Sequence, residues 1–213
     1  MRTEDLILVL ANGPRPRGRA AVVKRMGLAL VVSLAGALLV LLVGPGINPD
    51  AGAMLATPVF WAKLALPLSM ALAAMRVTAR LSQPGVTVGG AWISLALPLA
   101  IVWLVALAVL WIAPPGVRVA MLLGHTWRTC PSNIALLSLP ALGAMFWAMR
   151  GLAPTSPTLA GAATGLLAGT IGALVYCLRC PEVHVPFWAT WYPLGMALPA
   201  TIGSVLGRRV LRW

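Results

Sequence analysis

The sequence predicts an all-α integral membrane protein, a six-transmembrane-helix bundle with short loops and both termini in the cytoplasm. Of its 213 residues, 60% are hydrophobic and only 9% are charged, whereas about 25% of the residues in a soluble domain are charged. So few charges cannot cover the surface of a globular protein of this size. The mean hydropathy of +0.92 agrees with a chain that lies in a bilayer.

Six apolar stretches are long enough to cross the hydrocarbon core, which takes about 20 residues of helix. They cover residues 26–43, 53–75, 91–112, 134–149, 159–177 and 188–206. The groups "GPGINPD", "SQPG", "APPG" and "APTSP" separate the first five, because Gly, Pro and Asn break helices. The pattern predicts three parts: a cytoplasmic N-terminal helix with a basic tether (1–25), a six-helix transmembrane domain (26–207) and a cytoplasmic tail (208–213).

The basic residues indicate how the spans are oriented. With the N-terminus in the cytoplasm, twelve of the 16 Lys and Arg lie on the cytoplasmic side and three on the other, while Lys63 lies within a span. The twelve are Arg2, Arg15, Arg17, Arg19, Lys24, Arg25, Arg76, Arg80, Arg150, Arg208, Arg209 and Arg212, and the three are Arg118, Arg128 and Arg179. This bias follows the positive-inside rule. Because the charges interrupt apolar runs and form no single basic face, they do not indicate nucleic-acid binding.

Two cysteines occur in similar contexts at the outer ends of the fourth and sixth predicted spans. Cys130 lies in "RTCP" and Cys180 in "LRCP", and the preceding arginines are expected to favour the thiolate. The pair could form a disulfide or bind a soft metal ion, with Glu182 and His184 as candidate further ligands. Alternatively, both cysteines are small buried hydrophobic residues.

Cys177 and Lys63 each have a structural and a functional interpretation. Cys177 completes a C-x-x-C with Cys180, which is a redox spacing in soluble proteins. Its position at the end of an apolar helix favours a packing role instead. Lys63 lies several residues inside the second span, where a charge must face a partner or water, or extend to the interface.

Aromatic residues and glycines suggest how the last two spans are held. An outer aromatic belt is predicted at the membrane surface, where such rings are common, and it consists of Trp127, Trp188, Trp191 and Tyr192. The run "GAATGLLAG" puts Gly161, Gly165 and Gly169 on one helix face. This pattern permits close packing against a second helix.

The N-terminal "TEDLILVLANG" is predicted to form a short helix capped by Thr3. Its apolar stripe consists of Leu6, Ile7, Val9 and Leu10. A helix of this length is not stable alone in water. It therefore needs a surface, either the membrane or a groove on a partner protein.

These features together resemble the NrsF-like family of bacterial inner-membrane proteins over nearly the whole chain. The resemblance rests on the "DLILVLA" helix, the six spans, the two Cys-Pro sites, the closing "LGRRVLRW" and above all "CPEVHVPFWATWYPLGM". Members of that family are anti-sigma factors. The resemblance implies a multi-pass protein of the bacterial inner membrane that is not an enzyme and does not bind nucleic acid directly. It would hold an extracytoplasmic-function sigma factor at the cytoplasmic face of the lipid bilayer until metal or oxidative stress.

Carried over by position, the resemblance implies that Cys130 and Cys180 form the periplasmic sensing pair, and it assigns no role to Cys177. It implies no catalytic residue, and no cofactor beyond a soft metal ion bound transiently at the pair. It does not identify the residues that contact the sigma factor. We assign that contact to Leu6, Ile7, Val9 and Leu10, because their helix is short, apolar on one side and exposed.

Two other functions are compatible with single features of the sequence. A membrane thiol–disulfide oxidoreductase would pass electrons to a quinone through Cys130, Cys177 and Cys180, but the chain has only three cysteines and hence no second redox pair. A small transporter would use Lys63 and the prolines near it, but no second intramembrane charge accompanies Lys63.

Overall fold

The computed structural model describes residues 19–82, 88–150, 152, 154 and 156–211. Within these ranges the chain forms eight helices and no strand. The helices are α2 (Arg19–Val43), α3 (Ala51–Leu55), α4 (Pro58–Leu81), α5 (Ala91–Ile112), α6 (Pro115–Leu123), α7 (Cys130–Met149), α8 (Pro157–Tyr176) and α9 (Val185–Val210). The all-helical class predicted from the sequence is confirmed for this part of the chain.

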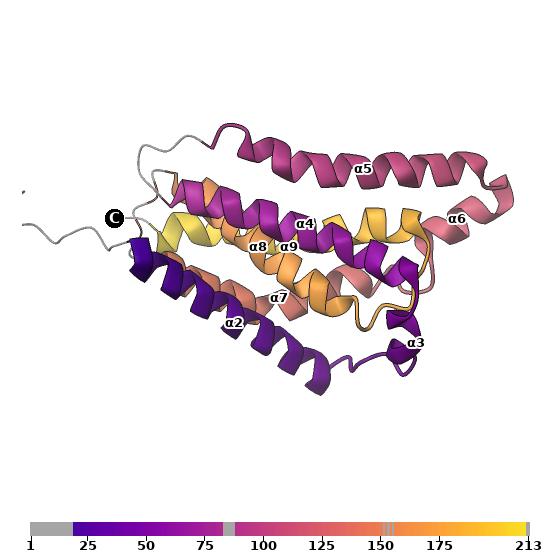
Figure 1. Cartoon of the computed structure of the whole chain (residues 1–213), viewed down its shortest axis with the longest axis horizontal. Coiled ribbons are helices and arrows are strands. Elements are labelled where there is room, and N and C mark those ends of the chain that lie inside the picture. Colours follow the sequence, from indigo (N-terminus) through magenta and orange to yellow (C-terminus); the bar gives the residue numbers. More distant parts are fainter. Residues whose placement is uncertain (1–18, 83–87, 151, 153, 155, 212–213) are drawn as a thin grey trace, which may run out of the picture.

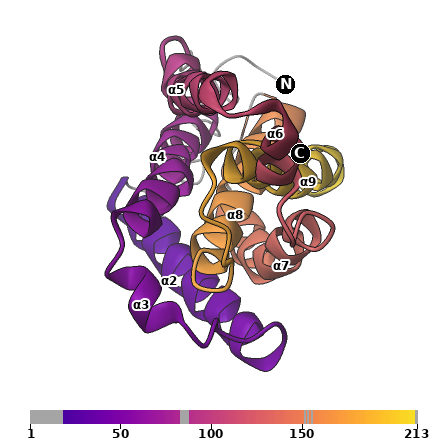
Figure 2. The same cartoon turned by 90° about the vertical axis from the view of Figure 1, so that its right-hand side faces the viewer.

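The six long helices run along the long axis of an elongated bundle (Figure 1). The central helix is α8, which contacts α2, α4, α7 and α9 and is surrounded by them in the end-on view of Figure 2. Its many Gly, Ala and Thr residues leave room for neighbours on every side. Helix α5 lies at the edge against α4 and α9, and its outer face exposes large apolar side chains such as Trp111 and Ile112. Such a face is suited to lipid, because hydrocarbon is its solvent in a bilayer.

The two ends of the bundle differ in chemistry. We call one the cysteine end, where α7 begins at Cys130 and the loop after α8 carries Cys180. Both acidic residues of the described part, Asp50 and Glu182, lie there. The opposite arginine end, where α2 begins and α9 ends, carries Lys24, Arg25, Arg76, Arg80, Arg150, Arg208 and Arg209. The cysteine end also carries Arg118, Arg128 and Arg179, so basic residues are more numerous at the arginine end and the described acidic residues lie at the cysteine end, as the sequence pattern predicts.

The six predicted spans coincide with α2, α4, α5, α7, α8 and α9. Five of these helices are long and apolar enough to cross a membrane, namely Val23–Val43 of α2 and all of α4, α5, α7 and α8. Helix α9 is long enough but less apolar. Five of the six predicted spans therefore have the length and hydropathy that crossing a membrane requires, while the sixth span and the orientation stay predictions.

The helix boundaries in the structure differ from the predicted ones at the start of the first span and around two of the connections between spans. Helix α2 begins at Arg19, so the end of the basic tether continues directly into the first span. The second span was predicted to begin at residue 53, but residues 53–55 belong to the separate short helix α3 and α4 begins only at Pro58. The connection after the third span, predicted as a loop, contains the short helix α6. Pro115 starts α6, and Gly124, with a φ of 55°, follows its last turn. The Trp191 indole donates a hydrogen bond of 2.9 Å to the Leu122 carbonyl, which fastens α6 to α9.

The glycine pattern of α8 forms a close contact with α9, so the packing role predicted for it is confirmed. A Cβ atom built on Gly165 would lie 2.1 Å from the Pro199 carbonyl oxygen, and one built on Gly161 would lie 2.2 Å from that of Gly203. The α9 side of the contact is also glycine, since a Cβ at Gly203 would meet the Gly161 carbonyl at 2.3 Å. Only glycine permits the two backbones to approach this closely.

We expect Gly165→Ala to destabilise the bundle by about 1–3 kcal/mol, because the added methyl overpacks a backbone contact that has no flexible side chain to move aside. The measurement is the thermal unfolding midpoint of the purified protein in mild detergent. The control is Gly27→Ala in α2, where a Cβ would meet nothing within 4 Å. Equal midpoints for the two variants would contradict the packing argument.

Candidate functional site

The three cysteines lie together at the cysteine end. Cys130 begins α7, with Pro131 in the first turn, while Cys177 follows α8 and Cys180 lies in the loop towards α9. All three are free thiols with 0% exposure, and they belong to one cluster of buried residues. The structure therefore brings the predicted pair together and adds Cys177 to it.

Lys63 reaches from α4 into the same site. Its side chain is 2% exposed, and its Nζ donates hydrogen bonds to the Cys180 carbonyl at 2.7 Å and the Glu182 carbonyl at 3.2 Å. A buried ammonium is costly unless it is hydrogen-bonded, and bonds from a charged donor are among the strongest in proteins. Lys63 thus faces a backbone partner and does not extend to the interface. It fastens the Cys180 loop to α4.

Glu182 holds the same loop from its other side. The carboxylate is 6% exposed, and its Oε1 accepts hydrogen bonds from the backbone N–H groups of His125 at 2.7 Å and Thr126 at 3.2 Å. A Cβ on Gly124 would lie 2.7 Å from Glu182 Oε2, so the close approach requires glycine there. The carboxylate thereby joins the Cys180 loop to the connection that precedes α7.

Two tyrosines complete the site, and the sequence analysis did not assign them to it. Tyr176 and Tyr192 have ring centroids 6.1 Å apart. Tyr192 is fully buried, and its hydroxyl lies beside the Cys177 and Cys180 thiols. The site thus contains a buried polar hydroxyl next to the two thiols of the loop.

The interpretation of Trp188 and Tyr192 as membrane-surface anchors is wrong. Their exposures are 4% and 0%, and together with the buried Met196 they form one face of α9 that packs into the bundle. Their spacing of four residues puts them on one side of a helix. That spacing was the signal in the sequence that could have placed Tyr192 inside.

Burial determines the resting protonation of the loop thiols. It raises the pKa of Cys177 to about 12 and also raises the pKa of Cys180, with the charge of Lys63 opposing the shift in both cases. For Cys180 the expectation that a neighbouring arginine favours the thiolate is therefore wrong, because desolvation outweighs the nearby positive charge. The thiolate is the reactive and metal-binding form, and both thiols are fully buried, so a reagent or metal ion reaches them only when the loop opens.

The two candidate further ligands do not join the thiols. The Glu182 carboxylate faces backbone amides, and His184 is exposed where it precedes α9. Across the described ranges, no group of three or more His, Cys, Asp or Glu side chains is arranged to hold a metal ion. The predicted sigma-factor contacts, Leu6, Ile7, Val9 and Leu10, lie outside the described residues.

Comparison with known proteins finds relatives along the full length. The family NrsF, negative regulator of sigma F, matches residues 10–213. The chain is 41% identical over 213 residues to the "Probable anti-sigma-F factor NrsF" of Azospira oryzae. It is 40% identical over 219 residues to the "Anti-sigma-F factor NrsF" of Caulobacter vibrioides, and both matches cover 100% of each chain. No solved structure matches.

We expect Lys63→Met to open the Cys180 loop, because the variant leaves two buried carbonyls without their charged donor. A hydrogen bond to a charged group contributes about 1.5–3 kcal/mol, so Cys180 should react with a polar maleimide at least about tenfold faster. The rate is measured on a background in which Cys130 and Cys177 are serine. Lys24→Met, at the exposed arginine end, is the control. A Lys63→Met rate equal to this control would mean that Lys63 does not hold the loop.

Proposed function

The chain belongs to the NrsF family of negative regulators of sigma F, and from that premise we propose that it is a membrane-bound anti-sigma factor. It sequesters an extracytoplasmic-function sigma factor at the cytoplasmic face of the inner membrane. The observation that carries the proposal is its full-length identity of 40–41% to two anti-sigma-F factors. The five apolar helices support the membrane location.

In this proposal the arginine end faces the cytoplasm and the cysteine end faces the periplasm. The support is the segregation of charge, since basic residues are retained on the cytoplasmic side of a membrane. Both ends of the transmembrane domain, the start of α2 and the end of α9, then lie beside the sigma factor. The cysteines lie at the opposite end, where oxidants and extracellular metal ions arrive.

We further propose that Cys130 and Cys180 sense the stress. On oxidation their two thiols would form a disulfide, giving two electrons to an external oxidant and releasing two protons. A soft metal ion would instead displace the two thiol protons and bind the two thiolates. Since Cys180 has 0% exposure, either reaction requires the loop that carries it to open.

Opening the loop would also affect the helices to which it is hydrogen-bonded. Displacing Cys180 would disturb the hydrogen bonds of Lys63 on α4 and those of Glu182 beside the start of α7. Both helices run to the arginine end, so a change at one end can alter the surface presented at the other. A hundredfold loss of sigma-factor affinity needs a coupling free energy of roughly 3 kcal/mol between the two sites.

The anti-sigma role is tested by affinity purification of the tagged full-length protein in mild detergent. We expect the sigma factor to copurify with the wild type and to be lost when residues 2–13 are deleted, because this removes the apolar stripe. The deletion keeps Arg15, Arg17 and Arg19, so the topology signals are retained. Leu6→Asp should weaken capture, while Asn12→Ala, outside the stripe, should not. A sigma factor retained by the deletion variant would put the contact elsewhere, and its absence from the wild type would contradict the anti-sigma role.

We expect serine substitution of Cys130 or Cys180 to abolish induction by cadmium or by an oxidant and to leave basal repression unchanged. The removed sulfur can neither bind the metal nor form the disulfide, while the isosteric hydroxyl preserves the packing. A sigma-dependent reporter measures both quantities. Cys177→Ser is the matched control, because Cys177 is equally buried and has no part in the proposed pair. A double variant that still responded like the wild type would falsify the sensing role.

A further inference from the structure

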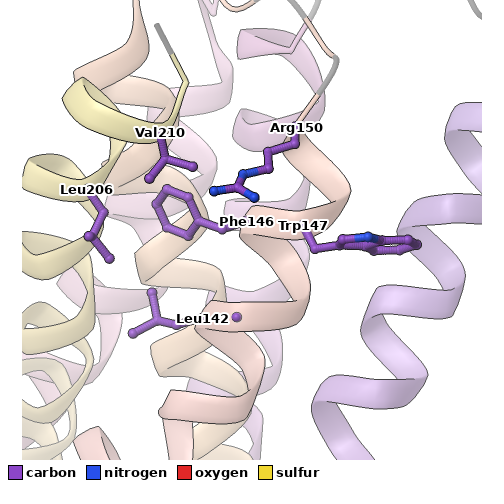
Figure 3. A pocket seen from close by; sticks show the side chains of 7 residues that line it. Leu142, Phe146, Trp147, Arg150, Leu206 and Val210 are labelled. Carbon is purple, nitrogen blue, oxygen red and sulfur yellow. The ribbon is translucent and has the colours of Figure 1, made fainter.

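A groove opens between α7 and α9 at the arginine end, and neither the sensing site nor the sigma-factor contact uses it. It has a volume of about 270 Å³. Its walls are Leu142 and Phe146 from α7 and Leu206 and Val210 from α9. The Arg150 side chain lies across the top of the groove above Phe146, as Figure 3 shows. The groove is therefore apolar along its length and cationic at one end.

The change from apolar to cationic lining along the groove matches the change from hydrocarbon to headgroups in one leaflet of a bilayer. From Arg150 to Leu142 the groove descends eight positions of α7, which corresponds to about 12 Å along the helix axis. Since α7 is one of the helices able to span a membrane, Arg150 lies at the level of its end and Leu142 lies at hydrocarbon depth. A soluble partner would have to enter the hydrocarbon to fill the groove. A lipid acyl chain is already there.

The charge at this end favours an anionic headgroup. Among the described residues, Arg150 has no acidic partner, because Asp50 and Glu182 are both at the cysteine end. Trp147 also lines the groove, and its ring extends towards α2 (Figure 3), where Arg25 stacks on it at 4.4 Å. The guanidinium of Arg25 is thus already engaged, and among the described residues Arg150 is the cation that lines the groove.

We propose that this groove is a binding site for one anionic phospholipid, with an acyl chain between Phe146 and Leu206 and the phosphate on Arg150. The inference goes beyond the anti-sigma activity and requires only that the helices lie in a bilayer. It holds whichever way the chain is oriented. A guanidinium binds phosphate with charge-assisted, often bidentate hydrogen bonds, which gives the site its headgroup preference.

Gly143 provides a way to fill the groove without disturbing the fold. It lines the groove, and a Cβ built on it would meet nothing within 4 Å. Gly143→Leu therefore puts a side chain where the acyl chain would lie. Gly27→Leu is the matched control, because Gly27 is also an exposed glycine of a span, has equally open space and does not line the groove. Arg150→Gln removes the headgroup contact and leaves the apolar walls intact.

Native mass spectrometry of the full-length protein, with phosphatidylglycerol or phosphatidylethanolamine of identical acyl chains, tests the site. We expect the wild type and Gly27→Leu to retain one phosphatidylglycerol, and Gly143→Leu to bind it about tenfold more weakly because the groove is filled. Arg150→Gln should lose most of the roughly tenfold preference for phosphatidylglycerol that one charged hydrogen bond provides.

Two results would overturn the proposal. The first is retention of phosphatidylglycerol by both Gly143→Leu and Arg150→Gln at the wild-type level. The second is loss of sigma-factor capture in Gly143→Leu with lipid retention unchanged, which would make the groove a protein-docking surface. If the wild-type protein did not bind the sigma factor, only the anti-sigma proposal would be contradicted, because lipid retention is measured without the sigma factor.

Discussion

The backbones of α8 and α9 touch because glycines on both helices leave no side chains between them, and the rest of the bundle is arranged around this contact. Gly161 and Gly165 meet the α9 backbone directly, so α9 is fixed in position and angle along α8. The loop 177–184 joins these two helices, and Cys177 and Cys180 within it are buried. Helix α9 also packs directly against α7, and the groove below Arg150 lies between the two.

The cysteine loop, residues 177–184, is held in place by two buried charged side chains. Lys63 donates to two of its carbonyls, and Glu182 accepts from the amides of the connection before α7. Each interaction joins segments far apart in the sequence, and each buries a charge, which is costly unless every partner is in place. Such an arrangement is strong when closed and is lost cooperatively when opened. The closed loop also shields the Cys180 thiol from solvent, which suits a sensor that must be silent at rest.

Periodicity and composition predicted most of the fold. The apolar runs located all six long helices, and the four-residue spacing of Gly161, Gly165 and Gly169 predicted a close helix contact before any partner was known. The short helix α6 was missed, and most of α3 was taken as the start of the second span, because short helices in connections depend on tertiary contacts, such as the bond from Trp191 to the α6 carbonyl. In the site, Cys130 and Cys180 stood out by their repeated Cys-Pro context. Tyr192 was predicted at the membrane surface because it lies near the end of a span. An aromatic residue at such a position looks the same in the sequence whether its side chain faces lipid or protein.

The sequence by itself determined that the chain is helical and apolar, where its helices lie, how its charge divides between two ends and which cysteines are candidates for chemistry. These properties depend on local hydropathy and on the residue types within one helix, so they can be read without knowing any neighbour. Only the tertiary structure decided that Lys63 faces the Cys180 and Glu182 carbonyls. It also decided that the Glu182 carboxylate accepts from backbone amides and that the three thiols are buried. Hydrogen bonding and desolvation are set by groups more than fifty residues away in the chain, and no local pattern encodes which of them will meet.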